Sequence, residues 1–354
     1  DVPLRKTDVT TVEAALAKAG EDRKKLDADA TAAAKPCVAV AFGADGRSLA
    51  CLGVDGRMTV VGTGDGQTRN AWDAARPAVP AGAAVAVSFT GGGRLLVVGA
   101  GQPAGLWDAG ETWTLERKIG GEATPPAGDD DPQGPPVDVV TALTFSPDGR
   151  MLASGSGRTS RSGEIKLWNV ADGVLARSLP LAHSDTVMAL EFSRRGDLLA
   201  SGAADRFVKI HAVADGKFVK SFEGHTGHVL GVTWQANGRR LASAGADGAI
   251  KIWDFVTGEQ QRTIAVGKKE VTAVRFIAPG EELLAASGEP AFRLYNAGNG
   301  SSVREFAAAG DFVQAIAATP VAAIAAAQDG KLRIWNLTTA AALHTVEPAP
   351  AASP

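Results

Sequence analysis

The chain has 354 residues, of which 45% are hydrophobic and 21% are charged, so it is long enough to bury a large core. Its formal net charge of −3 gives no general attraction to nucleic acid or to an anionic membrane, and we expect no nucleic-acid partner. No run of about 18 apolar residues occurs, which excludes a membrane-spanning helix and argues against membrane insertion.

The N-terminal region differs from the rest of the chain. Thr10 and Glu13 have the spacing of a capping box, and apolar residues follow at helical intervals over residues 8–35, with Gly20 as an interruption. We therefore expect residues 1–36 to form a short helical extension or linker. The first residue is Asp1 rather than Met, which favours a processed protein, periplasmic or exported rather than cytoplasmic.

The two cysteines, Cys37 and Cys51, fall in one predicted β-hairpin. If Phe42 pairs with Leu49 across the turn, Cys51 lies on the Phe42 face and Cys37 on the other, because side chains alternate along a strand. That geometry is poor for a disulfide. The sequence favours two buried or half-buried free thiols.

From Val38 onward one pattern occurs seven times: an apolar strand, a tight turn, a second strand, another turn, and a third strand that ends in an aromatic position. It is clearest in VLGVTWQANGRRLASAGADGAIKIWD, which begins at Val229. A fourth apolar stretch follows each copy. Four antiparallel strands about every 40 residues are typical of the blades of a β-propeller. The aromatic position is held, in chain order, by Val61, Trp107, Trp168, His211, Trp253, Tyr295 and Trp335.

These copies resemble the WD40 (WD-repeat) family over residues 37–347. The resemblance implies an all-β fold, a seven-bladed WD40 β-propeller, preceded by the helical extension and followed by a disordered tail at 348–354. The segment AALHTVE reads as the fourth strand of the last blade, whereas VPLRKTDV near the N-terminus keeps open the alternative that this end supplies it.

In that family a His, a Ser, an Asp and a Trp of one blade form a hydrogen-bonded tetrad. The full set occurs once here, as His225, Ser243, Asp247 and Trp253. A buried indole N–H and a buried hydroxyl need partners, so the role implied is structural. We expect no catalytic residue, no metal site and no cofactor.

Other repeats keep only part of the tetrad. The fourth has His183, Ser201 and Asp205 but carries His211 at the Trp position, which we interpret as a small core substitute rather than a metal ligand. The sixth has Glu289 and Tyr295, and the seventh has Asp329 and Trp335 without the His. We expect these blades to depend more on apolar packing.

The largest irregularity is the 61-residue interval between Trp107 and Trp168, against 40 to 46 elsewhere. Two insertions account for it. The longer carries Asp129, Asp130 and Asp131, and the shorter carries Arg158 and Arg161. In a WD-repeat blade both loops emerge on one face, so we expect them to be neighbours. They pair with each other or form a docking surface, and the two roles are not exclusive. Contiguous carboxylates lack the alternate spacing of a calcium loop.

The resemblance implies a non-catalytic protein-interaction scaffold, acting alone or as a subunit of a larger complex. The phrases AHSDTVMALEFS and SRSGEIKLWNVADG are also similar to planctomycete WD40 proteins, some of them joined to cytochrome-like domains. That second resemblance favours a bacterial protein and keeps open an accessory subunit or fragment of a redox assembly. A propeller enzyme is a third alternative, against which the Ala- and Val-rich inner strands argue.

Overall fold

The fold was analysed in a computed structural model, which describes residues 37–42, 48–53, 58–63, 68–72, 84–89, 94–99, 104–108, 114–119 and 139–346 without 278, 308–311 and 320. Over these residues all the regular structure is β, in strands β1 to β28 that form seven four-stranded sheets. The helix predicted over residues 8–35 and the tail predicted at 348–354 lie outside the described residues. No helix of membrane-spanning length and hydropathy occurs in the described part of the chain.

Each sheet is built from four consecutive strands, paired antiparallel in chain order. The first three sheets hold β1 (Cys37–Phe42), β2 (Ser48–Gly53), β3 (Met58–Gly62) and β4 (Thr68–Trp72); β5 (Ala84–Phe89), β6 (Arg94–Gly99), β7 (Ala104–Asp108) and β8 (Thr114–Ile119); and β9 (Val139–Phe145), β10 (Met151–Arg158), β11 (Ser162–Asn169) and β12 (Leu175–His183). The fourth and fifth hold β13 (Val187–Phe192), β14 (Leu198–Ala203), β15 (Val208–Ala212) and β16 (Phe218–Phe222); and β17 (Val229–Trp234), β18 (Arg240–Gly245), β19 (Ala249–Asp254) and β20 (Gln260–Ala265). The last two hold β21 (Val271–Phe276), β22 (Glu282–Ser287), β23 (Phe292–Asn296) and β24 (Ser302–Phe306); and β25 (Val313–Ala318), β26 (Ala322–Ala327), β27 (Leu332–Asn336) and β28 (Ala342–Val346).

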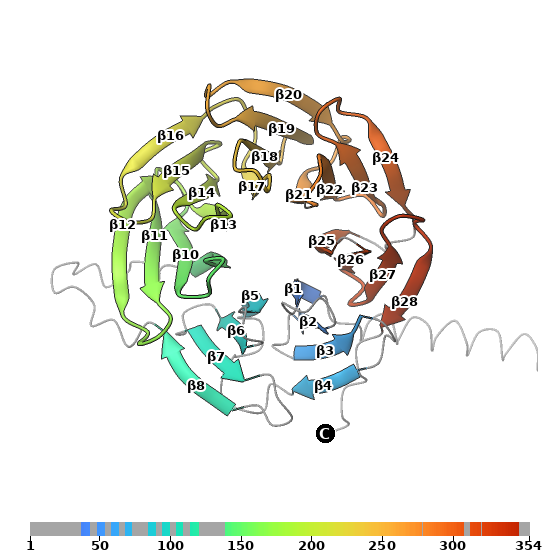
Figure 1. Cartoon of the computed structure of the whole chain (residues 1–354), viewed down its shortest axis with the longest axis horizontal. Coiled ribbons are helices and arrows are strands. Elements are labelled where there is room, and N and C mark those ends of the chain that lie inside the picture. Colours follow the sequence, from blue (N-terminus) through green and yellow to red (C-terminus); the bar gives the residue numbers. More distant parts are fainter. Residues whose placement is uncertain are drawn as a thin grey trace, which may run out of the picture.

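The sheets stand side by side in a ring, with the first strand of each near the centre and the fourth at the rim (Figure 1). β1 contacts β5, β5 contacts β9, and the series continues through β13, β17 and β21 to β25, which returns to β1. The arrangement is propeller-like. In such a ring a sheet can bury both faces against its neighbours, which a single sheet could not do alone.

The C-terminal part of the chain supplies β28, the fourth strand of the seventh sheet, as the sequence pattern predicted. Within the described residues no strand passes between the first and seventh sheets. The ring closes there through apolar side chains, with Leu49 and Val61 packed among Ile324, Ala326 and Ile334. This seam therefore depends on side-chain packing rather than on a shared hydrogen-bonded strand.

The tight turns predicted after the first strand of each repeat are confirmed in three sheets. Gly149, Gly196 and Gly238 have φ angles of 70°, 75° and 71°. Glycine adopts this left-handed backbone without the steric penalty of a Cβ atom. The turns position the second strand so that it pairs directly with the first.

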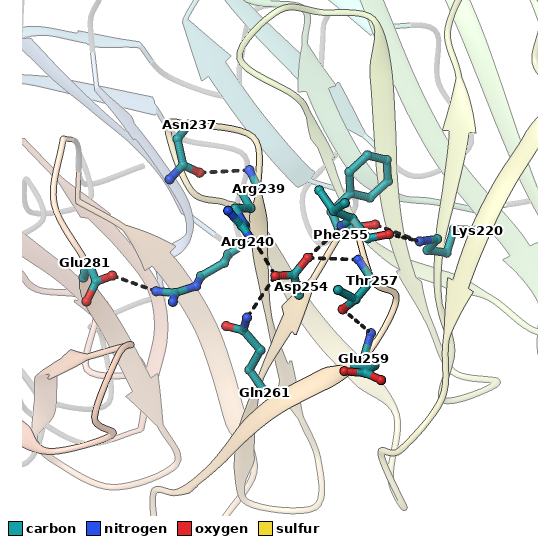
Figure 2. A network of polar contacts seen from close by, with 11 residues as sticks. Lys220, Asn237, Arg239, Arg240, Asp254, Phe255, Thr257, Glu259, Gln261 and Glu281 are labelled. Carbon is teal, nitrogen blue, oxygen red and sulfur yellow. Dashed lines mark hydrogen bonds and ion pairs between the residues drawn. The ribbon is translucent and has the colours of Figure 1, made fainter.

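Neighbouring sheets are also joined at the rim by one repeated contact. In β12, β16, β20 and β24 a basic residue donates to a backbone carbonyl between the third and fourth strands of the next sheet. These rim clamps are Arg177 Nη2 to Ala214 O (2.7 Å), Lys220 Nζ to Phe255 O (2.8 Å), Arg262 Nη2 to Gly298 O (2.7 Å) and Arg304 Nη1 to Leu337 O (2.9 Å). Figure 2 shows the clamp of Lys220.

The prediction of two free thiols is wrong. Cys51 is disulfide-bonded, Cys37 is the chain's other cysteine, and the described residues include no free one. Phe42 pairs with Leu49 as expected, but the register shifts further along the hairpin, where Ala39 pairs with Leu52 and Cys37 with Gly53. A β-bulge of this kind inserts one residue and so cancels the strict alternation of faces on which the prediction relied.

Candidate functional site: the polar tetrads and the surrounding loops

The fifth sheet brings the four predicted tetrad residues together. His225 precedes β17, Ser243 lies on β18, Asp247 lies in the turn before β19, and Trp253 lies on β19. His225 Nδ1 is 2.9 Å from Asp247 Oδ2, His225 Nε2 is 2.8 Å from Ser243 Oγ, and Trp253 Nε1 donates to Ser243 Oγ at 2.8 Å. Asp247 also accepts the backbone N–H of Thr226 at 3.0 Å. The tetrad thus ties the loop before the sheet to its second and third strands.

The environment of this tetrad is unsuited to catalysis. Ser243 is 0%, Trp253 2% and His225 6% exposed. Burial lowers the pKa of His225 although the hydrogen bond with Asp247 raises it. Burial raises the pKa of Asp247, but the Thr226 N–H and His225 outweigh it and hold that pKa below its usual value. Both imidazole nitrogens are engaged and the hydroxyl is inaccessible, so Ser243 has no route to a substrate carbonyl.

The fourth sheet holds the same arrangement without its aromatic member. His183 Nδ1 is 2.9 Å from Asp205 Oδ2, and His183 Nε2 is 2.8 Å from Ser201 Oγ. Ser201 donates instead to the backbone carbonyl of Lys209 at 3.2 Å. His211 is 6% exposed, its Nδ1 has no hydrogen-bond partner, and burial together with His183 and Lys209 lowers its pKa to about 4. A neutral His211 fits a packing role in the core.

In the sixth and seventh sheets an arginine replaces the histidine as the partner of the acidic residue. Arg333 makes an ion pair with Asp329, and Arg293 Nη1 lies 3.4 Å from Glu289 Oε2. In the sixth sheet Gly267 stands at the histidine position, and a Cβ there would lie only 2.6 Å from Glu289 Oε1. Sequence reasoning missed this substitution. Its signal was an arginine two positions before the Trp position, Arg293 and Arg333, where the complete tetrad has Lys251.

The shorter insertion is a rigid extension of two strands. β10 and β11 pair along their length until Arg158 faces Ser162, so Arg158 and Arg161 lie exposed at the tip of a long hairpin. The backbone N–H of Ser160 donates to Asp185 Oδ1 at 2.9 Å, which anchors the tip on the segment between β12 and β13. The acidic residues Asp129, Asp130 and Asp131 lie outside the described residues.

On the opposite face, polar side chains pair with one another (Figure 2). Asp254 is 3% exposed and accepts the backbone N–H groups of Val256 at 2.8 Å and Thr257 at 3.1 Å, which hold its pKa below its usual value. Arg240 Nη1 lies 2.7 Å from Glu281 Oε1 and links the fifth sheet to the sixth. This network closes turns and joins sheets.

Comparison with known proteins identifies the repeat. Residues 133–169, 173–211 and 216–254 match the family model described as "WD domain, G-beta repeat". These stretches make up about a third of the chain and run into the third strands of the third, fourth and fifth sheets. The chain therefore contains WD40 repeats in this part of the ring.

Two curated relatives were found. The chain is 29% identical over 136 residues to a coronin-like protein of Saccharomyces cerevisiae, a match that covers 35% of this chain and 18% of the relative. It is 37% identical over 67 residues to polyadenylation factor subunit 2 of Eremothecium gossypii, which covers 19% of this chain and 14% of the relative. The matches thus span less than a fifth of each relative's length.

Proposed function

We propose that this protein is a non-catalytic interaction scaffold of the WD40 type, in which the seven sheets are the blades of one propeller. The observation that carries the proposal is that its two Ser–His–Asp sets make buried hydrogen bonds within single sheets. Both are buried, and the complete one ends on an indole N–H. These polar groups stabilise blades, which leaves the exposed loops to recognise partners.

The docking surface that we propose is the pair of insertions. Arg158 and Arg161 are exposed on a hairpin that Asp185 holds in place, so little ordering entropy is lost when a partner binds. The acidic residues Asp129, Asp130 and Asp131 belong to the same surface in this proposal. The expected partner is a protein that carries charges of both signs.

The relatives support a role in assemblies. One of them is named as a subunit of a factor, and WD40 repeats generally mediate contacts between proteins. The alternative of an accessory subunit of a redox assembly has no support from the family match or from these two relatives.

We also propose that the protein works in an oxidising compartment. The disulfide of Cys51 supports this location, because disulfides persist in secreted and periplasmic proteins and are rare in the reducing cytosol.

The docking proposal is tested by reversing charge at the hairpin tip. We expect the double variant Arg158→Glu/Arg161→Glu to lose partners that the parent captures from a lysate of the source organism, as judged by quantitative mass spectrometry. The matched control is Arg194→Glu/Arg195→Glu, because those arginines are also exposed but lie in the turn between β13 and β14, at the other end of the strands.

Charge steers association most strongly at low ionic strength, so the loss should be larger in dilute salt. Equal capture by the parent and by both variants would place the working surface elsewhere on the ring.

A further inference from the structure

The seam between the fifth and sixth sheets is filled by smaller side chains than the two seams beside it. Between the fourth and fifth sheets Phe222 lies 5.3 Å from Trp253. Between the sixth and seventh, Phe306 stacks on Phe292 at 4.7 Å, and Phe292 meets Trp335 at 5.0 Å. The corresponding positions between the fifth and sixth sheets are held by Ile264 and Tyr295, which fill less space.

A cleft of about 550 Å³ lies at this seam. It follows the outer strand β20 from Arg262 to Val266 and reaches Asn299 and Gly300 at one end and Glu289 at the other. β20 and β24 are the rim strands of the two sheets, so the cleft lies on the outside of the ring (Figure 1). Its size is within the range of ligand sites, and its elongated, open form suits an extended chain.

One of the two arginines that line the cleft takes part in no ion pair within the described residues. Arg293 occupies both nearby acids, with Nε 2.8 Å from Glu305 Oε2 and Nη1 3.4 Å from Glu289 Oε2. Arg262 uses one N–H group on the carbonyl of Gly298, and it takes part in none of the ion pairs found in the described residues. Lys268 and Lys269 follow in the loop after β20, both exposed, with Glu270 as the one carboxylate of that loop, and Lys269 Nζ donates to the carbonyl of Gly288 at 2.7 Å.

We propose that this cleft binds a short acidic peptide segment of a partner, with a peptide carboxylate on the guanidinium of Arg262. A guanidinium binds a carboxylate through two parallel N–H groups. The hydrogen bond to the Gly298 carbonyl leaves other N–H groups of Arg262 available for this. Thr263, Asn299 and Ser302 line the cleft and supply polar groups for a peptide backbone. This site is separate from the hairpin proposed above and does not depend on it.

The test uses the full chain and a fluorescein-labelled decapeptide of alternating Glu and Gly, followed by fluorescence anisotropy at low salt. A Lys/Gly decapeptide and free succinate are the comparison ligands. We expect the acidic peptide to bind, and Arg262→Met to weaken it by about tenfold or more, the loss of one charge-assisted pair. The matched control is Arg304→Met, which removes the same rim clamp at the next seam, where aromatic rings fill the space.

Refilling the cleft gives an independent variant. Ile264→Phe and Tyr295→Trp restore the side chains found at the neighbouring seams, and circular dichroism with a thermal melt checks that each folds. Both positions are buried, so a larger side chain there costs some stability. We expect either folded variant to lose peptide binding.

The proposal is overturned if the acidic peptide does not bind, if the Lys/Gly peptide binds as well, or if Arg262→Met binds like the parent. It is also overturned if Arg304→Met loses binding to the same extent, which would indicate a diffuse charge effect. Succinate that competes as strongly as the peptide would make the ligand a small dicarboxylate instead.

Discussion

At the scale of single residues, the tetrad shows which polar contacts carry stability. Trp253 donates to the buried hydroxyl of Ser243, whereas Trp335 of the seventh sheet has Ala325 at the corresponding position. We expect Trp253→Phe to cost about 1 kcal/mol more than Trp335→Phe, because it also leaves a buried hydroxyl without its donor. Urea unfolding of the two variants measures the difference.

A double-mutant cycle separates the hydrogen bond from the packing. Combined with Ser243→Ala, the Trp253→Phe change should show a coupling of about 0.5–2 kcal/mol, and a coupling of zero would contradict the assigned bond.

His211 makes a second residue-scale prediction, about pH. Its pKa falls to about 4 in the folded chain, against 6.5 as the ordinary value. Between these two pH values the imidazole is protonated in the unfolded chain but neutral in the folded chain. The free energy of unfolding is therefore highest above pH 6.5 and decreases as the pH falls toward 4. The loss is at most about 3 kcal/mol. Unfolding midpoints at several pH values measure it.

His211→Phe should flatten this pH dependence without removing it, because burial also lowers the pKa values of His183 and His225. An unchanged pH slope in the variant would show that His211 does not titrate as described.

The sequence located His211 at the Trp position but gave no reason for it. The reason lies in a neighbour: a Cβ on Gly224 would come within 3.0 Å of the Trp253 ring, and the fourth sheet has Ala182 at the position of Gly224. A tryptophan at 211 would meet that methyl group. Such compensation joins residues that are distant in sequence and is visible only once the loop is placed.

At the scale of elements, the repeat period located the strands because each one alternates between faces and is bounded by turn residues. It also located the third-sheet insertion, although as a loop and not as the paired extension of β10 and β11 that forms. The disulfide was missed because the alternation of apolar and polar residues does not reveal a single β-bulge, and the bulge changes the face on which Cys37 lies. The cleft was missed because it results from several small deviations at one seam, Ile264, Gly267 and Tyr295, each ordinary alone.

At the scale of the whole molecule, the described residues show two kinds of contact between neighbouring sheets. Rim clamps join the third to the seventh sheets, whereas apolar packing carries the seam between the seventh and the first. The first sheet lies at this seam and contains the disulfide of Cys51. In the unfolded chain that bond reduces the conformational freedom of the segment that forms the first hairpin.

Removing that disulfide should therefore loosen the ring at one place first. A loop of this length corresponds to about 3 kcal/mol in the chain-entropy model. We expect dithiothreitol to lower the unfolding midpoint and to raise hydrogen exchange in β1 to β4 and in β28 before β17 to β20 respond, because the disulfide constrains the first sheet and proteins can open locally. The variant Cys37→Ser/Cys51→Ser should show the amide hydrogen exchange of the reduced parent, and dithiothreitol should not change it. Exchange that rises equally in all seven sheets would mean that the ring opens as one cooperative unit.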